Sequence, residues 1–127
     1  MGGQFCNKLQ VLEMTAENVF SWTIKADLPE ERWDAASAVH EGRLYVMGGD
    51  MEEVANVVII YDPVNDTWVA GPDADDFGPW PRATILDGKI HLVTRGAVLE
   101  HREGAWVEVA QRYSNTYYHT SASLLLG

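Results

Sequence analysis

The chain has 127 residues, and its 9 basic against 19 acidic side chains give a formal net charge of −10. A hydrophobic content of 46% at this length fits one domain with a buried core and argues against disorder. The acidic balance disfavours nucleic acids and anionic membranes as partners. No apolar run approaches the roughly 20 residues that span a bilayer.

The cysteine content and the N-terminal residues bear on the cellular compartment. Cys6 is the single cysteine, which excludes an internal disulfide framework and a multi-cysteine metal site. The first residues lack the basic-then-apolar order of a signal peptide. A lone cysteine fits a reducing compartment, so we expect a cytoplasmic protein.

The apolar residues form short runs rich in β-branched and aromatic side chains, without helical spacing. The acid–glycine pairs Glu41-Gly42 and Asp87-Gly88 each separate two such runs, as in two-residue β-hairpins. The pattern predicts an all-β fold of antiparallel hairpins with no helix. In chain order, the expected strands include residues 43–47, 57–61, 67–69, 89–93, 97–99, 106–109 and 123–126.

Two independent series of residues indicate an internal repeat. Trp22, Trp68 and Trp106 are separated by 46 and then 38 residues. The glycines of the hairpins are separated by 46 and then 39 residues; they are Gly42, Gly88 and Gly127. A repeat of about 40 to 50 residues with four strands has the size of one β-propeller blade.

The residues Gly48-Gly49, Tyr61-Asp62-Pro63 and Trp68 resemble the kelch repeat, which has a double glycine after its second strand, a tyrosine in its third and a tryptophan in its fourth. The resemblance is strongest over residues 32–70 and extends to 1–24 and 82–107. In the last region Thr94-Arg95 replaces the double glycine, and no tyrosine occupies the third strand. The resemblance implies a kelch-type β-propeller in which Tyr61 and Trp68 pack between adjacent sheets.

About three four-stranded blade equivalents are expected in this chain. They would comprise a partial blade at 1–24, a complete blade at 25–70, a divergent blade at 71–107 and a partial blade at 108–127. Propellers usually close with about four to eight blades. Two expectations follow: the chain is a segment of a longer propeller, or two copies complete each other's split blades as a homodimer with six.

The expected function is that of a protein–protein interaction scaffold. In a four-stranded antiparallel blade, the loop after the second strand and the connection to the next blade leave the same face, and the kelch resemblance implies that this face receives a protein or peptide. Carboxylates beside aromatic and arginine side chains favour a basic partner. The candidate partner-binding residues are Asp50, Glu52, Glu53, Asp73, Asp75, Asp76, Trp80, Arg82, Arg32, Trp33, Arg112 and Tyr113, with Phe77 and Tyr117 and Tyr118 on the same connections.

Two other functions remain open. Some kelch propellers are oxidases, hydrolases or isomerases, although no catalytic residues can be assigned here and an enzyme is not the favoured interpretation. A carbohydrate-binding β domain would use an exposed Trp33 or Trp80 to stack on sugar. No metal or other cofactor is expected, because residues 73–76 lack the spacing of a calcium loop and the four histidines are scattered. His91 lies in an expected strand, which predicts a packed or hydrogen-bonded role.

Overall fold

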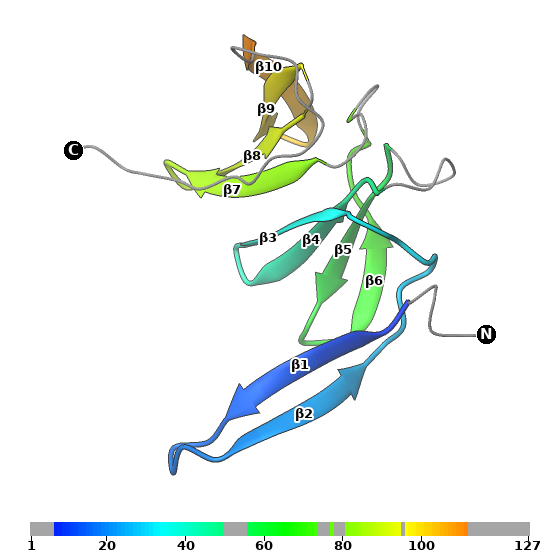
Figure 1. Cartoon of the computed structure of the whole chain (residues 1–127), viewed down its shortest axis with the longest axis vertical. Helices are drawn as coiled ribbons and strands as arrows, with labels where there is room; N and C mark the ends of the chain where they lie inside the picture. Colours follow the sequence, from blue (N-terminus) through cyan, green and yellow to red (C-terminus); the bar gives the residue numbers. More distant parts are fainter. Residues whose placement is uncertain (1–6, 50–55, 74–76, 78–80, 95, 112–127) are drawn as a thin grey trace.

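The computed structural model describes residues 7–49, 56–73, 77, 81–94 and 96–111. Over these residues the chain forms β-strands and no helix, so none of the described segments is a helix able to cross a membrane. Three sheets follow one another along the chain (Figure 1), and all of their strand pairs are antiparallel. The prediction of an all-β fold is therefore confirmed.

The first sheet is a two-stranded ribbon, whose strand bounds the sequence pattern did not provide. Its strands are β1 (Leu9–Met14) and β2 (Phe20–Lys25). Their turn is closed by the Thr15 hydroxyl, which accepts hydrogen bonds from the backbone N–H groups of Glu17 and Val19. A threonine hydroxyl commonly stabilises a turn in this way.

The second and third sheets each contain four strands in chain order, which is the strand number of a propeller blade. The second sheet consists of β3 (Ala36–His40), β4 (Arg43–Met47), β5 (Val58–Asp62) and β6 (Thr67–Ala70). The third consists of β7 (Arg82–Leu86), β8 (Lys89–Val93), β9 (Ala97–Arg102) and β10 (Ala105–Gln111). The expected strand at 123–126 lies outside the described residues.

Two-residue turns join β3 to β4 and β7 to β8, as the acid–glycine pairs predict. Glu41 and Gly42 have φ values of 50° and 75°, and Asp87 and Gly88 have values of 53° and 72°. Positive φ at both central residues is the requirement of the type I′ turn, whose twist matches that of the flanking strands. Each pair therefore fixes the register of its hairpin.

The main hydrophobic core lies between the two four-stranded sheets. The second sheet contributes Tyr45, Met47, Val58 and Ile60 among others, and β8 contributes buried apolar side chains on alternate positions. The inner strands β3 and β7 approach each other on one side of this core. The core residues are Ala36, Tyr45, Met47, Val58, Ile60, Phe77, Ile90 and Leu92.

The same tryptophan contact links each four-stranded sheet to the segment that follows the last strand of the sheet before it. Trp68 Nε1 donates to the carbonyl of Ala26, and Trp106 Nε1 donates to the carbonyl of Pro72, at 2.9 and 2.7 Å. Tyr61 is only 4% exposed, and its ring centroid lies 5.1 Å from that of Trp68. Trp68 therefore contacts the segment that follows the ribbon, and Tyr61 packs against Trp68.

His101 occupies the place of the tyrosine in the third sheet. It is opposite Trp106 in the ladder, as Tyr61 is opposite Trp68, and the ring centroids are 5.2 Å apart. The two-residue turn after β9 is shorter than the turn after β5, which shifts the spacing to the tryptophan. The sequence spacing alone therefore does not show that His101 and Tyr61 occupy equivalent positions.

Candidate functional site

The connections β4–β5 and β6–β7 leave the same end of the second sheet, which we call the loop end. The N–H of Gly48 donates to the carbonyl of Val57 at 3.0 Å and closes the base of the first connection. Asp73 Oδ1 accepts a hydrogen bond from the N–H of Val58 at 2.9 Å. Side chain and backbone thus fasten the second connection directly to the base of the first.

Asn56 provides a further link between these connections. Its Oδ1 accepts a hydrogen bond from the N–H of Phe77 at 2.9 Å. The Phe77 side chain is fully buried, and its ring packs edge-on against Trp106 with centroids 5.6 Å apart. Phe77 is therefore an anchor in the core, and its expected place on the partner-facing surface is wrong because the apolar ring fills the space between the sheets.

Arg32 brings the β2–β3 connection to the same end. Its Nη1 donates to the carbonyls of Gly48 and Val57 at 2.9 and 2.7 Å, and Nη2 lies 3.7 Å from Glu30 Oε2. The residue is 8% exposed. Burial lowers the pKa of Arg32, and the charges of Glu30 and Asp73 act in the opposite direction. A planar guanidinium with several donors can hold two carbonyls of one loop at once.

The structure places the candidate partner-binding residues at different depths. Trp33 is 41% exposed on the β2–β3 connection and Asp73 is exposed, whereas Arg32 lies beneath the loops. Arg82, at the start of β7, is half-buried and its Nη1 donates to the carbonyl of Pro81 at 2.9 Å. The candidates outside the described residues are Asp50, Glu52, Glu53, Asp75, Asp76, Trp80, Arg112, Tyr113, Tyr117 and Tyr118.

The roles of Asn56 and Arg32 in building the loop end were not foreseen. Asn56 lies two residues before the start of β5, in a place where an amide commonly makes a local turn, but its partner is 21 residues away. Arg32 contacts carbonyls 16 and 25 residues away. No local spacing in the sequence indicates such partners.

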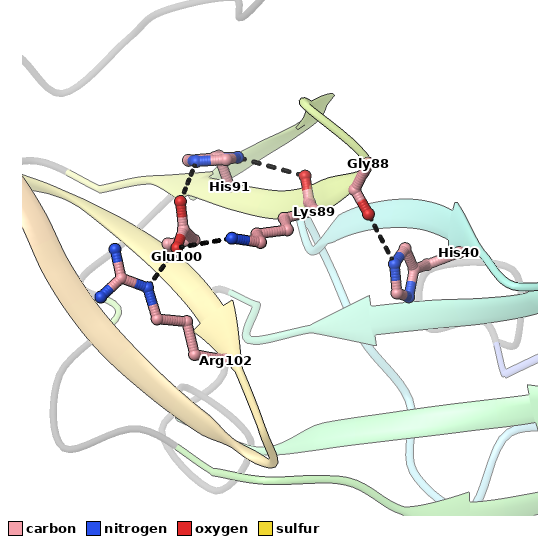
Figure 2. A network of polar contacts seen from close by, with 6 residues as sticks. All are labelled: His40, Gly88, Lys89, His91, Glu100 and Arg102. Atoms are coloured by element: carbon pink, nitrogen blue, oxygen red, sulfur yellow. Dashed lines mark hydrogen bonds and ion pairs between the residues drawn. The ribbon is translucent and has the colours of Figure 1, made fainter.

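A second group of polar residues surrounds Glu100 on the third sheet (Figure 2). His91 Nε2 lies 2.9 Å from Glu100 Oε2, and its Nδ1 lies 3.1 Å from the carbonyl of Lys89. Arg102 Nε donates to Glu100 Oε1, and Lys89 Nζ is 3.8 Å from the same oxygen. The hydrogen bond from Arg102 is the main cause of the lowered pKa of Glu100, and burial opposes it. His91 is buried, so its predicted hydrogen-bonded role is confirmed.

The His91–Glu100 pair replaces an apolar pair of the second sheet. His91 is opposite Glu100 in the β8–β9 ladder, and Tyr45 is opposite Ile60 at the same position of the β4–β5 ladder. The contacts of the pair lie within its own sheet, so its present chemistry is structural. Within the part of the chain that the structure describes, no three His, Cys, Asp or Glu side chains are grouped to hold a metal ion.

Comparisons with known proteins agree with the repeated sheets. Residues 32–74 match the Kelch motif family. An F-box/kelch-repeat protein of Arabidopsis thaliana is 23% identical over 115 residues, covering 84% of this chain and 30% of its own. Alpha-scruin of Limulus polyphemus is 30% identical over 92 residues, covering 66% of this chain and 10% of its own. The chain therefore spans a third or less of these two relatives.

The solved structure of YjhT supports the fold. It superposes with a TM-score of 0.66 at 17% sequence identity, over 84% of this chain and 46% of YjhT. The matched motif at residues 32–74 contains the second sheet, including the packed pair Tyr61 and Trp68. The third sheet repeats that arrangement with His101 and Trp106. Residues 32–74 therefore carry a Kelch motif, and the four-stranded sheets of the chain are kelch-type blades.

Proposed function

We propose that this chain is part of an interaction scaffold that binds a protein or peptide partner of basic character at the loop end of the second sheet. The proposal is supported by its kelch-repeat relatives, among them the F-box/kelch-repeat protein and alpha-scruin. No bond is made or broken in this function. The blades provide a rigid support, and the loops provide the contacts.

The observation that carries the proposal is the fastening of three connections to one another. Arg32, Asp73 and Asn56 reach from one connection to the backbone of another. A loop whose ends are held in this way loses little further conformational freedom when it binds, which favours affinity. The same three residues would be unnecessary for the sheets themselves, whose ladders are complete without them.

The chemistry of the loop end supports a basic partner. Trp33 offers an exposed indole surface, and aromatic side chains of this kind are frequent anchors at protein interfaces. Glu30, Glu31 and Asp73 are exposed on the same connections. The formal charge of −10 adds a long-range attraction for cations, which increases the rate of encounter at low ionic strength.

Selection from a random displayed peptide library against the purified chain tests this function. We expect the recovered peptides to be enriched in lysine and arginine and to bind less tightly as salt increases, because the attraction is screened. Trp33→Ala should weaken binding of a recovered peptide by at least tenfold. Glu31→Gln should weaken it by a smaller factor, since a charge at the rim of an interface contributes less.

Two matched variants at other places provide the controls. Val64→Ala removes an exposed apolar side chain from the β5–β6 turn, at the opposite end of the second sheet. Glu17→Gln removes an exposed carboxylate from the ribbon turn. Both should bind the recovered peptides as the unchanged chain does. Failure to recover any peptide, or equal binding by Trp33→Ala, would contradict the proposal.

A further inference from the structure

Two histidines lie where the second and third sheets meet, a contact that we call the joint. Each has a buried ring nitrogen without a hydrogen-bond partner in the described part of the chain; the atoms are His40 Nδ1 and His101 Nε2. Buried polar atoms are nearly always paired in folded proteins, so each exception calls for a physical explanation. An imidazole is also the side chain that changes its charge near neutral pH. The protonation of these two rings therefore bears directly on how well the sheets pack.

His40, the last residue of β3, makes a hydrogen bond across the joint. Its Nε2 lies 2.8 Å from the carbonyl of Gly88 in the β7–β8 turn (Figure 2). A carbonyl oxygen can only accept, so Nε2 carries the proton of the neutral ring and Nδ1 is an acceptor. A second proton would bind at Nδ1, where none of the described atoms accepts it. A charged His40 would therefore carry an unpaired donor between the sheets.

His101 packs among aromatic rings from both sheets. Its ring centroid lies 5.9 Å from that of Tyr45 on β4 and 5.2 Å from that of Trp106 on β10. The Tyr45 ring also contacts His40, with centroids 6.1 Å apart. Tyr45 belongs to the main hydrophobic core, and Trp106 packs against that core. A proton on His101 would therefore place a charge beside apolar groups, which costs free energy unless the charge is paired.

Two ionisable groups near the β3–β4 turn act on His101 with opposite signs. Burial is the main cause of the lowered pKa of His101, the charge of His40 acts in the same direction, and Glu41 opposes both. Glu41 is exposed, so solvent weakens its attraction. On β9 itself, Glu100 and Arg102 alternate to the opposite face and pair with each other there. The net effect of these surroundings is to hold His101 neutral.

We propose that mild acid loosens the joint, because protonation of His101 places an unpaired charge between the two sheets and a charged His40 adds repulsion. A base whose pKa is lowered by folding stabilises the protein fully above its unfolded value of 6.5, and this contribution is lost as the pH falls through the folded value. The carboxyl groups with lowered pKa values have unfolded values of 3.8 and 4.5, so their effect comes at lower pH. The joint is therefore a pH-sensitive element of the fold, separate from the loop end.

Exchange of the tryptophan indole protons with solvent, followed by NMR, tests the loosening. The Trp106 indole donates to the Pro72 carbonyl at the joint, and the Trp68 indole makes the same kind of bond to Ala26 at the ribbon, which provides an internal reference. From pH 7.5 to pH 5.5, the exchange rate of Trp106 relative to Trp68 should rise roughly two- to tenfold. In the same pH series the His101 ring should titrate below 6.5.

Three substitutions separate this role from simple packing. His101→Phe keeps an aromatic ring and should abolish the change in relative exchange. His40→Gln keeps a donor for the Gly88 carbonyl without an ionisable ring, and it should raise the pKa of His101 toward 6.5. Glu41→Gln removes the opposing carboxylate and should lower that pKa further. The matched control Glu17→Gln, on the exposed ribbon turn, should leave it unchanged.

Three results would overturn the proposal. They are a titration of His101 at or above 6.5, equal acceleration of exchange at both indoles in acid, and a full pH response in His101→Phe. Where His101→Phe does not fold, His40→Gln and Glu41→Gln test the proposal by themselves. A pKa of His101 that responds to neither of these variants contradicts it.

Discussion

Trp68 and Ala26 are 42 residues apart in the chain, and the hydrogen bond between the Trp68 indole and the Ala26 carbonyl joins the second sheet to the ribbon. The backbone N–H of Ala26 donates in turn to Asp66 Oδ1, the same oxygen that accepts a hydrogen bond from the Tyr61 hydroxyl. One carboxylate and one indole therefore hold the end of β2 against the second sheet. In the second sheet, Tyr61 and Trp68 therefore contribute to the same attachment of β2.

Trp68→Ala should lower the free energy of unfolding by about 2 to 3 kcal/mol. This loss is below the roughly 3 to 5 kcal/mol for a fully buried tryptophan, because Trp68 is only partly buried. Trp68→Phe should cost about 1 kcal/mol, since it keeps most of the ring and loses one hydrogen bond. Urea unfolding monitored by circular dichroism measures both changes. A loss below about 0.5 kcal/mol for the alanine variant would contradict the role of this contact.

Ionisation of the Tyr61 hydroxyl should lower the stability of the protein at alkaline pH. Burial and the hydrogen bond to Asp66 raise the pKa of Tyr61 from 10.0 to about 12. Because the folded pKa is the higher one, the stabilisation is complete below pH 10 and is lost as the pH rises toward 12. Absorbance at the tyrosinate band should show one group titrating near 12 in the folded protein. The group should disappear in Tyr61→Phe, and in Asp66→Asn its pKa should move toward 10.

At acidic pH the dependence of stability on pH has the opposite sign, so stability falls as the pH is lowered. Asp66 has a lowered pKa, chiefly because its carboxylate accepts the hydrogen bond of Tyr61, and Asp62 has a lowered pKa because it accepts that of Asn65. A carboxyl group whose pKa is lowered in the folded state stabilises the protein at pH values above its unfolded pKa of 3.8. This stabilisation is lost as the pH falls below that value. Thermal unfolding between pH 5 and pH 2.5 should show this loss. Asp66→Asn should make the dependence shallower, whereas the exposed Glu17→Gln should leave it unchanged.

Arg32→Met should open the loop end while preserving the sheets. The variant removes the donor of the Gly48 and Val57 carbonyls and should lower the free energy of unfolding by about 1.5 to 3 kcal/mol, the range for hydrogen bonds to charged groups. Hydrogen exchange should accelerate at Gly48 and Val58 before it accelerates in β4 and β8. Arg43→Met, at an exposed position of β4, is the matched control and should change stability by less than about 0.5 kcal/mol.

In the β3–β4 turn, one substitution should lower the free energy of unfolding and another should raise it. Gly42→Ala should cost about 1 to 2 kcal/mol, because Gly42 has a φ of 75° and an L-residue is strained there even though open space surrounds it. Glu41→Asn should be stabilising, since asparagine adopts positive φ more readily and Asn-Gly is the preferred pair of this turn. Equilibrium unfolding in urea measures both variants. A stabilising Gly42→Ala would contradict the type I′ geometry.

The local features of the fold could be predicted from the sequence because they depend on adjacent residues. Residues 43–47 and 89–93 were expected as strands and form β4 and β8 with the same bounds. The turns at Glu41-Gly42 and Asp87-Gly88 follow from the conformational preference of an acid–glycine pair. The repeat spacing of the tryptophans then indicated the blade.

The remaining features depend on contacts between distant residues. The bulge in β10 and the equivalence of His101 with Tyr61 depend on turn length and on the register of the ladder. The number of residues between β9 and Trp106 does not reveal either of them. At the candidate site, the common exit of the two loops was predicted from strand alternation and is confirmed by the Asp73 and Asn56 contacts. The depth of Arg32 and Phe77 was not predictable, because burial at this end depends on how the second and third sheets pack together.

The chain order of the strands has a consequence for how the protein is made. In both four-stranded sheets every strand pairs with the strand that precedes or follows it in the sequence. Each ladder therefore closes over a short length of chain, which favours rapid formation. During translation the strands of a sheet can pair as soon as the fourth strand leaves the ribosome, and the core face is then buried when the next sheet packs on it. When Trp68 or Trp106 is synthesised, the carbonyl to which its indole donates has already been made, because it follows the last strand of the preceding sheet.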